Sequence, residues 1–167
     1  MDERLYSRPL DVHRISEYPE VQRMITYLFD EMKSSGLIGK SPRNKILKHL
    51  KVVVLDLYVG YLSDPFLYIG YPRAKSQYSR ESRLGQLFFG YRPMMRVVDG
   101  LKTLGYLESH KGFQDLSTGR SRQSRMRATQ SLIDLIEHHS VTPLMIQRED
   151  QEVIVLRDVD GEDISFA

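Results

Sequence analysis

Side chains that could bind a polyanion lie on one face of the helix predicted over residues 93–104. An apolar stripe at helical spacing marks the opposite, core-facing side, and its members are Met94, Val97, Val98, Leu101 and Leu104. The outward face then carries Arg92, Met95, Arg96, Asp99 and Lys102. Arginine and lysine donate hydrogen bonds to base edges and phosphates, and a carboxylate can accept one from a cytosine amino group. This face is therefore a candidate nucleic-acid surface.

A second group of cations follows directly, between residues 109 and 127, where Asp115 is the single acid. The five cations are Lys111, Arg120, Arg122, Arg125 and Arg127. Because alternate residues of a strand share a face, Arg125 and Arg127 should point the same way, toward a phosphate or a minor groove. The alternative is that these charges protect an exposed edge strand from aggregation. If about five cations meet phosphates, log affinity should fall with log salt at a slope of about −4 to −5.

The charge of the chain is unevenly distributed. Residues 80–127 hold 10 Lys and Arg against 4 Asp and Glu, whereas residues 128–167 hold 2 against 9. The formal net charge of the whole chain is only +2. A basic centre suits a polyanionic partner and an acidic end would stay clear of one, although chance clustering on a solvated surface gives the same count.

The first element that must support these residues is a helix predicted over residues 19–34. Pro19 suits its first turn, Ser35 and Gly36 end it, and six apolar residues recur at helical spacing. They are Val21, Met24, Ile25, Leu28, Phe29 and Met32. This stripe over residues 21–32 has two interpretations, completion of the core or the contact face of a homodimer.

Further elements follow from apolar patterns and from Gly and Pro. Helices are predicted over residues 41–62, 80–88 and 129–139, the first of them apolar nearly all round and so central to the core. Strands are predicted over residues 66–71, 106–113 and 121–128. Residues 143–147 and 153–157 predict two further strands, and Asp160-Gly161 a hairpin turn in the acidic end.

This order of elements resembles the winged helix–turn–helix superfamily over about residues 44–140. The resemblance is carried by the string Leu101-Lys102-Thr103-Leu104-Gly105-Tyr106-Leu107, in which a helix ends in Gly and an apolar strand begins, and by the basic hairpin after it. MarR-like regulators have such an Arg-rich wing. The acidic strand segment after the basic domain is also similar to the N-terminal part of plasmid, phage or mobile-element replication proteins.

The resemblance implies an α+β fold, a winged helix–turn–helix with an added N-terminal helix and a C-terminal β-hairpin. It divides the chain into an N-terminal arm and helix (1–40), a winged-helix domain (41–140) and an acidic strand segment (141–167). The implied function is sequence-specific binding of double-stranded DNA, as a transcription regulator or as part of a replication protein. The alternative is a protein-interaction module with the same fold. RNA binding is less favoured, because no exposed aromatic platform is evident on the basic strand.

Several other classes are not supported by the sequence. The absence of cysteine excludes disulfides and thiolate chemistry, and no serine nucleophile motif or His cluster at metal-ligand spacing is present. We therefore expect no enzyme activity, no metal and no cofactor. His49 is expected at the surface. No apolar run approaches the roughly 20 residues of a membrane span and no secretory signal is evident, so a cytoplasmic protein is expected.

Overall fold

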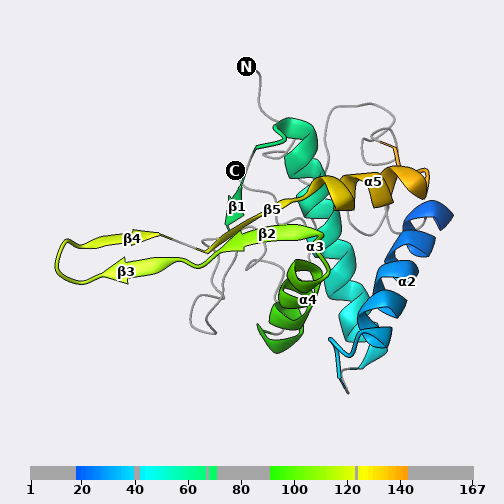
Figure 1. Ribbon diagram of the computed structural model, residues 1–167, viewed down its shortest axis with the longest axis horizontal. Helices are drawn as coiled ribbons and strands as arrows, with labels where there is room; N and C mark the ends of the chain where they lie inside the picture. The colour runs from blue at the N-terminus through cyan, green and yellow to red at the C-terminus, as the bar shows by residue number, and fades with distance from the viewer. Residues whose placement is uncertain (1–17, 40–41, 67, 71–90, 123, 143–167) are drawn as a thin grey trace, which may run out of the picture.

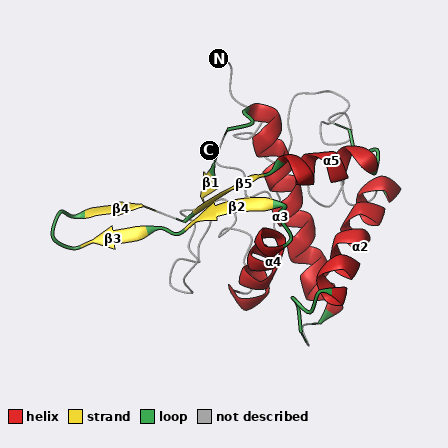
Figure 2. Ribbon diagram, viewed as in Figure 1, coloured by secondary structure: helices red, strands yellow, loops and turns green. Residues whose placement is uncertain are grey.

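The structure, a computed structural model, describes residues 18–39, 42–66, 68–70, 91–122 and 124–142. Within these ranges the chain is α+β, as predicted, with helices packed on one side of a small antiparallel sheet (Figures 1 and 2). The predicted helix over 80–88, the N-terminal arm and the acidic C-terminal hairpin lie outside the described residues. None of the described helices has the length and apolar character that crossing a bilayer requires.

Helix α2 (Pro19–Ser34) has the predicted bounds, and all six residues of its apolar stripe are 0–3 % exposed. The stripe packs into the core of a single chain, chiefly against α3, so the interpretation of it as a homodimer face is wrong. The helix ends where Gly36 takes a φ of +72°, which lets Leu37 N–H donate to the Met32 carbonyl. Glycine enters this left-handed conformation at little cost, and the carbonyls of the last turn are satisfied.

Helix α3 (Arg43–Ser63) runs through the centre of the molecule, with α2, α4 and the sheet around it (Figure 1). Residues 52–59 are all buried, which agrees with the prediction of a helix that is apolar nearly all round. His49 is also buried, at 3 % exposure, so its expected place at the surface is wrong. Burial lowers the pKa of His49. Its Nδ1 lies 2.6 Å from the Lys45 carbonyl oxygen, which can only accept, so Nδ1 is the donor.

The sheet has the strand order β1 (Ile69–Gly70), β5 (Arg125–Ala128), β2 (Leu107–His110), with both pairings antiparallel. Ile69, Leu107 and Met126 are 0–2 % exposed and form the inner face of the sheet, against the helices. Helix α4 (Tyr91–Thr103) precedes β2, and α5 (Gln130–His138) follows β5. Because successive residues of a strand point to opposite faces, the neighbours of Leu107 and Met126 lie on the outer face of the sheet, away from the helices.

A two-stranded ribbon continues β2 and β5 past the end of the three-stranded part of the sheet (Figure 2). Strands β3 (Phe113–Asp115) and β4 (Arg120–Arg122) pair in the same register that joins β2 to β5, so one hairpin runs from Leu107 to Ala128 with no inserted residue. Between the two paired segments, Gly112 N–H donates to Ser124 Oγ at 2.9 Å. The outer half of the ribbon projects away from the body (Figure 1).

Candidate nucleic-acid interface

The inward face of α4 anchors it firmly. Met94, Val97, Val98 and Leu101 are 0–1 % exposed, and Leu104 is partly buried beside them, so the stripe predicted from the sequence lies in the core. Arg92, Arg96, Asp99 and Lys102 are exposed on the other side, as expected. Met95 differs, because its side chain is only 9 % exposed and so does not stand out from the surface as predicted.

The end of α4 is fixed by the residues that join it to the sheet. Gly105 takes a φ of +83°, and Tyr106 N–H donates to the Leu101 carbonyl, the same end as in α2. The Tyr106 hydroxyl donates to Glu31 Oε1 at 2.6 Å and so ties this joint to α2. Burial and that hydrogen bond to a carboxylate raise the pKa of Tyr106 well above its usual value, so the hydroxyl keeps its proton at neutral pH.

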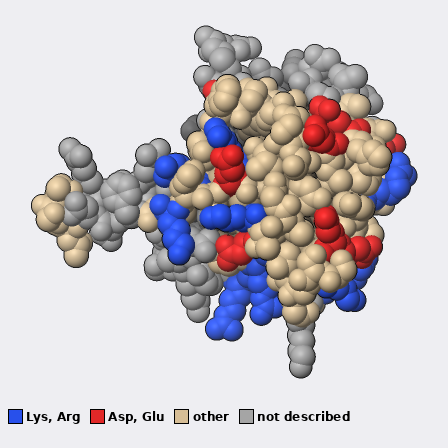
Figure 3. Space-filling view, viewed as in Figure 1, with Lys and Arg blue, Asp and Glu red and all other residues tan. Residues whose placement is uncertain are grey.

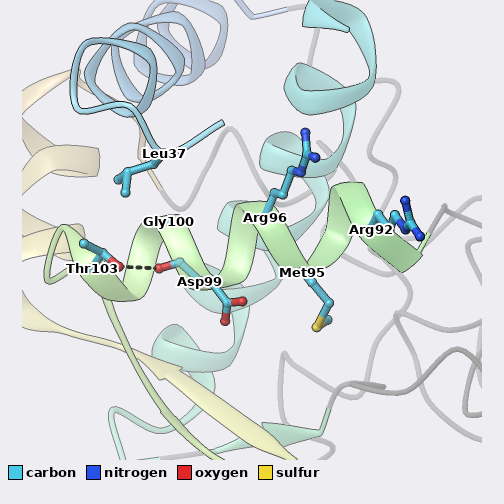
Figure 4. A pocket seen from close by; sticks show the side chains of 7 residues that line it. All are labelled: Leu37, Arg92, Met95, Arg96, Asp99, Gly100 and Thr103. Atoms are coloured by element: carbon cyan, nitrogen blue, oxygen red, sulfur yellow. Dashed lines mark hydrogen bonds between the residues drawn. The ribbon is translucent and has the colours of Figure 1, made fainter. Parts of the chain in front are cut away.

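A hollow of about 350 Å³ runs along the outward face of α4 (Figure 4). Its lining consists of Leu37, Arg92, Met95, Arg96, Asp99, Gly100 and Thr103. Arg92 and Arg96, one helical turn apart, extend from one side of the helix, and Met95 and Asp99 extend from the other (Figure 4). Arg96 Nη1 donates to the Ile38 carbonyl at 3.3 Å, which directs its guanidinium along the hollow. Met95 and Leu37 make part of the lining apolar, so the hollow offers both apolar and cationic contacts.

Lys102 connects this face with the root of the ribbon. Its Nζ donates to the Ser109 carbonyl at 3.3 Å, across the junction of α4 and β2. Lys111, the next cation along the ribbon, is exposed. Arg120 and Arg122 lie on β4, but their side chains are outside what the structure describes. A basic surface can thus be followed from Arg92 through Lys102 to Lys111.

Arg125 and Arg127 share a face of β5, as their alternation predicts, but this is the face turned away from the core. Met126 between them is 0 % exposed on the inner side, where α3 and α4 pack. The expectation of one continuous set of cations formed by α4 and the hairpin is therefore not met at these two positions. Among the described residues, Arg125 and Arg127 lie on the side of the sheet opposite α4 and its cations.

Arg125 and Arg127 form a group around Tyr68, the residue before β1. The guanidinium carbons of Arg127 and Arg125 lie 4.6 and 5.6 Å from the centre of its ring. The Tyr68 hydroxyl donates to Glu108 Oε2 at 3.2 Å, and the same carboxylate oxygen is 3.0 Å from Arg127 Nη2. His110 completes the group, with its ring centre 5.4 Å from that of Tyr68. We call these five residues the outer-face cluster.

Sequence reasoning missed Tyr68, Glu108 and His110 as members of a site. The aromatic segment before Pro72 predicts a strand, yet nothing in it shows which residue pairs with which arginine. The register sets Arg127 opposite Glu108 and Arg125 opposite His110, and pairs Ile69 with Met126. Cross-strand neighbours on one face are about 5 Å apart, so register alone brings these side chains together.

Basic and acidic side chains are unevenly distributed on the face shown in Figure 3, although some Lys and Arg also lie along the edge formed by α2. Lys and Arg gather over the root of the ribbon and over α4, with a few acidic side chains among them, whereas Asp and Glu lie mostly over the part formed by α2 and α5. Such a distribution favours approach of a polyanion from the side of α4 and the ribbon. Among the described residues no group of three His, Asp or Glu side chains is arranged to hold a metal ion.

Comparison of the chain with descriptions of known protein families, with curated proteins and with solved structures finds no match in any of the three.

Proposed function

We propose that this protein binds double-stranded DNA, with α4 in the major groove and the ribbon along the adjacent backbone or minor groove. The arrangement proposed is a winged helix–turn–helix, in which α3, β1, α4 and the hairpin from β2 to β5 are the recognisable parts. The strand order β1, β5, β2 and the position of α4 directly before the hairpin support this assignment. A helix about 10–12 Å wide fits the major groove of B-form DNA.

The observation that carries the proposal is the division of α4 into two faces. On its inward face Met94, Val97, Val98 and Leu101 are 0–1 % exposed. Arg92, Arg96 and Lys102 are exposed on the other face, beside a projecting ribbon. A helix held this firmly can present its outward side chains without being reshaped by the partner. Arg92 and Arg96 would contact base edges or phosphates, and Lys102 and Lys111 would hold the backbone.

Salt dependence of binding to a short labelled duplex of random sequence tests the electrostatic part. With Arg92, Arg96, Lys102 and Lys111 as phosphate contacts, we expect log affinity to fall with log salt at a slope of about −3 to −4, shallower than the slope expected when Arg125 and Arg127 also take part. The double variant Arg92→Ala with Arg96→Ala should bind about tenfold or more weakly, with a slope shallower by about 2, since each lost phosphate contact changes it by about 1. Duplex affinity that ignores salt, or no duplex binding by the wild-type chain, would contradict the proposal.

A matched control is available on α2. Arg23 is an exposed cation on that helix, away from the stripe that faces the core. The variant Arg23→Ala removes the same charge as Arg96→Ala and should leave both affinity and slope close to wild type. Equal losses in the two variants would mean that net charge, rather than the α4 face, governs binding.

Selection of bound sequences from the same random duplex then distinguishes the two biological roles. A selected palindrome favours a dimeric transcription regulator, because half-sites repeat with the symmetry of the protein. Direct repeats favour a replication protein that assembles along its origin. Asp99, on the edge of the hollow, predicts cytosine at one selected position.

A second candidate function, docking of a protein segment, is favoured by the shape of the hollow along α4. A lining that combines Leu37 and Met95 with Arg92 and Arg96 fits an apolar side chain flanked by acidic residues. The duplex experiment separates the candidates: unchanged DNA affinity in the Arg92 and Arg96 double variant favours docking of a protein.

A further inference from the structure

We infer that the outer-face cluster is a binding site for single-stranded nucleic acid, separate from the duplex surface of α4. The inference rests on side chains that three strands bring together, and it does not require the proposed function to be correct. Its ligand would be an unpaired segment of DNA or RNA whose bases expose their flat faces.

The first support is the combination of flat side chains with cations. Tyr68, His110 and two guanidinium groups lie within one small area of the sheet, where ring and guanidinium contacts of 4.6–5.6 Å join them. Bases of single strands stack on aromatic rings and on arginine planes, and arginine adds attraction for the phosphates.

The second support is that the cluster is held in place before any ligand arrives. Glu108 Oε2 accepts from Arg127 Nε at 3.1 Å and from the Tyr68 hydroxyl at 3.2 Å, so one carboxylate fixes both the guanidinium plane and the ring beneath it. The side chains of Arg127 and Glu108 remain 26 % and 47 % exposed, so they are fixed and yet accessible. A site ordered in advance loses less conformational entropy on binding.

The third support is the charge that remains. Glu108 offsets Arg127, whereas Arg125 makes no ion pair with any of the described residues and stacks only on Tyr68. Arg125 is therefore the member that can neutralise a phosphate. In the antiparallel register it lies opposite His110, whose Nε2 is 3.3 Å from the Tyr68 hydroxyl and so belongs to the same hydrogen-bonded group.

Unpaired rather than paired nucleic acid is indicated by the chemistry and by the position. In a duplex the base faces are covered by their neighbours, so a stacking surface finds nothing to stack on. The cluster also lies on the face of the sheet opposite Met126 and α4, so a duplex in contact with α4 leaves it free. A sheet surface of this kind accommodates about two or three bases.

Fluorescence anisotropy with labelled oligothymidylate and oligouridylate of about 15 nucleotides tests the inference on the full chain. We expect both to bind, and an excess of unlabelled duplex not to displace them. The variant Tyr68→Ala should lose about tenfold or more in affinity, because stacking on one ring is lost. Tyr68→Phe keeps the ring and loses only the hydrogen bonds of the hydroxyl, with Glu108 and His110, so it should bind more tightly than Tyr68→Ala. A thermal denaturation midpoint of Tyr68→Ala near that of wild type excludes loss of the fold as the cause. A preference between the two oligomers would show whether the ligand is DNA or RNA.

Arg125→Ala provides the second arm and should also weaken oligothymidylate binding. The control is Tyr27→Ala, which removes an equally large ring that is 46 % exposed on α2. The inference is overturned if wild type does not bind the oligomers, if Tyr68→Ala and Arg125→Ala bind like Tyr27→Ala, or if duplex displaces the oligomer fully. Failure of duplex binding alone would contradict the proposed function and leave this site standing.

Discussion

The outward face of α4 and the outward face of the sheet carry the same kind of side chain in different surroundings. On α4, Arg96 and Lys102 are exposed and donate to backbone carbonyls, and Arg96 lines a hollow. On the sheet, Arg127 is stacked on a ring and paired with a carboxylate. The first arrangement suits long-range attraction of phosphates, and the second suits contact with a flat ligand. Basic residues adjacent in sequence thus need not serve one partner.

The largest change in the free energy of unfolding is expected from a substitution at Leu101, the residue that anchors α4 in the core. Leu101 is 0 % exposed, so Leu101→Ala should lower the free energy of unfolding by about 2–5 kcal/mol, measured by urea denaturation. Its exposed neighbour supplies the control, since Lys102→Ala should change stability by no more than about 0.5 kcal/mol. Stability that falls equally in both would mean that the two faces of α4 are not separated as described.

The sequence predicts the α4 face better than the sheet face for a physical reason. A helix repeats every 3.6 residues, so Val97, Val98 and Leu101 alone define its core side and leave Arg92 and Arg96 outside. The order of most elements and the α+β class follow from similar local patterns. The cluster around Tyr68 depends on the pairing of β1 with β5, residues far apart in the chain, and no local period encodes that register. Burial of Met95, which the helical period places on the outward face, is likewise not set by a local pattern.

A smaller change in the free energy of unfolding is expected from a substitution at Gly105, which joins α4 to the sheet. Gly105 has a φ of +83°, and a Cβ added there would meet no atom within 4 Å, so Gly105→Ala is penalised by the left-handed backbone alone. We expect a loss of about 1 kcal/mol in the free energy of unfolding, because the cost of that conformation is partly offset by a less flexible unfolded chain. Thermal denaturation would measure it.

The end of α5 offers the reverse substitution. Ser140 has the same left-handed conformation, with a φ of 62°, and Val141 N–H donates to the Ile136 carbonyl as at the ends of α2 and α4. Ser140→Gly should therefore stabilise the chain by a few tenths to about 1 kcal/mol. Destabilisation by this change would show that the serine makes a compensating contact, and the cost assigned to the conformation at Gly105 would then also be in doubt.

The smallest and most selective effect is expected from Glu108→Gln, which removes a negative charge from the outer-face cluster and keeps an oxygen that can accept from Tyr68. The exposed ion pair contributes little, so stability should change by less than about 1 kcal/mol. Oligothymidylate should bind a few-fold more tightly at low salt, with a slope against log salt steeper by about 0.7, because Arg127 becomes free to neutralise a phosphate.

The control is Glu137→Gln, the same change at an exposed position of α5, which should alter neither the affinity for oligothymidylate nor its salt slope. Duplex affinity should stay unchanged in Glu108→Gln, because Glu108 lies on the face of the sheet opposite α4, the proposed duplex surface. A matching rise in duplex affinity would instead join the cluster to the surface of α4, and the contrast between the two regions would be lost.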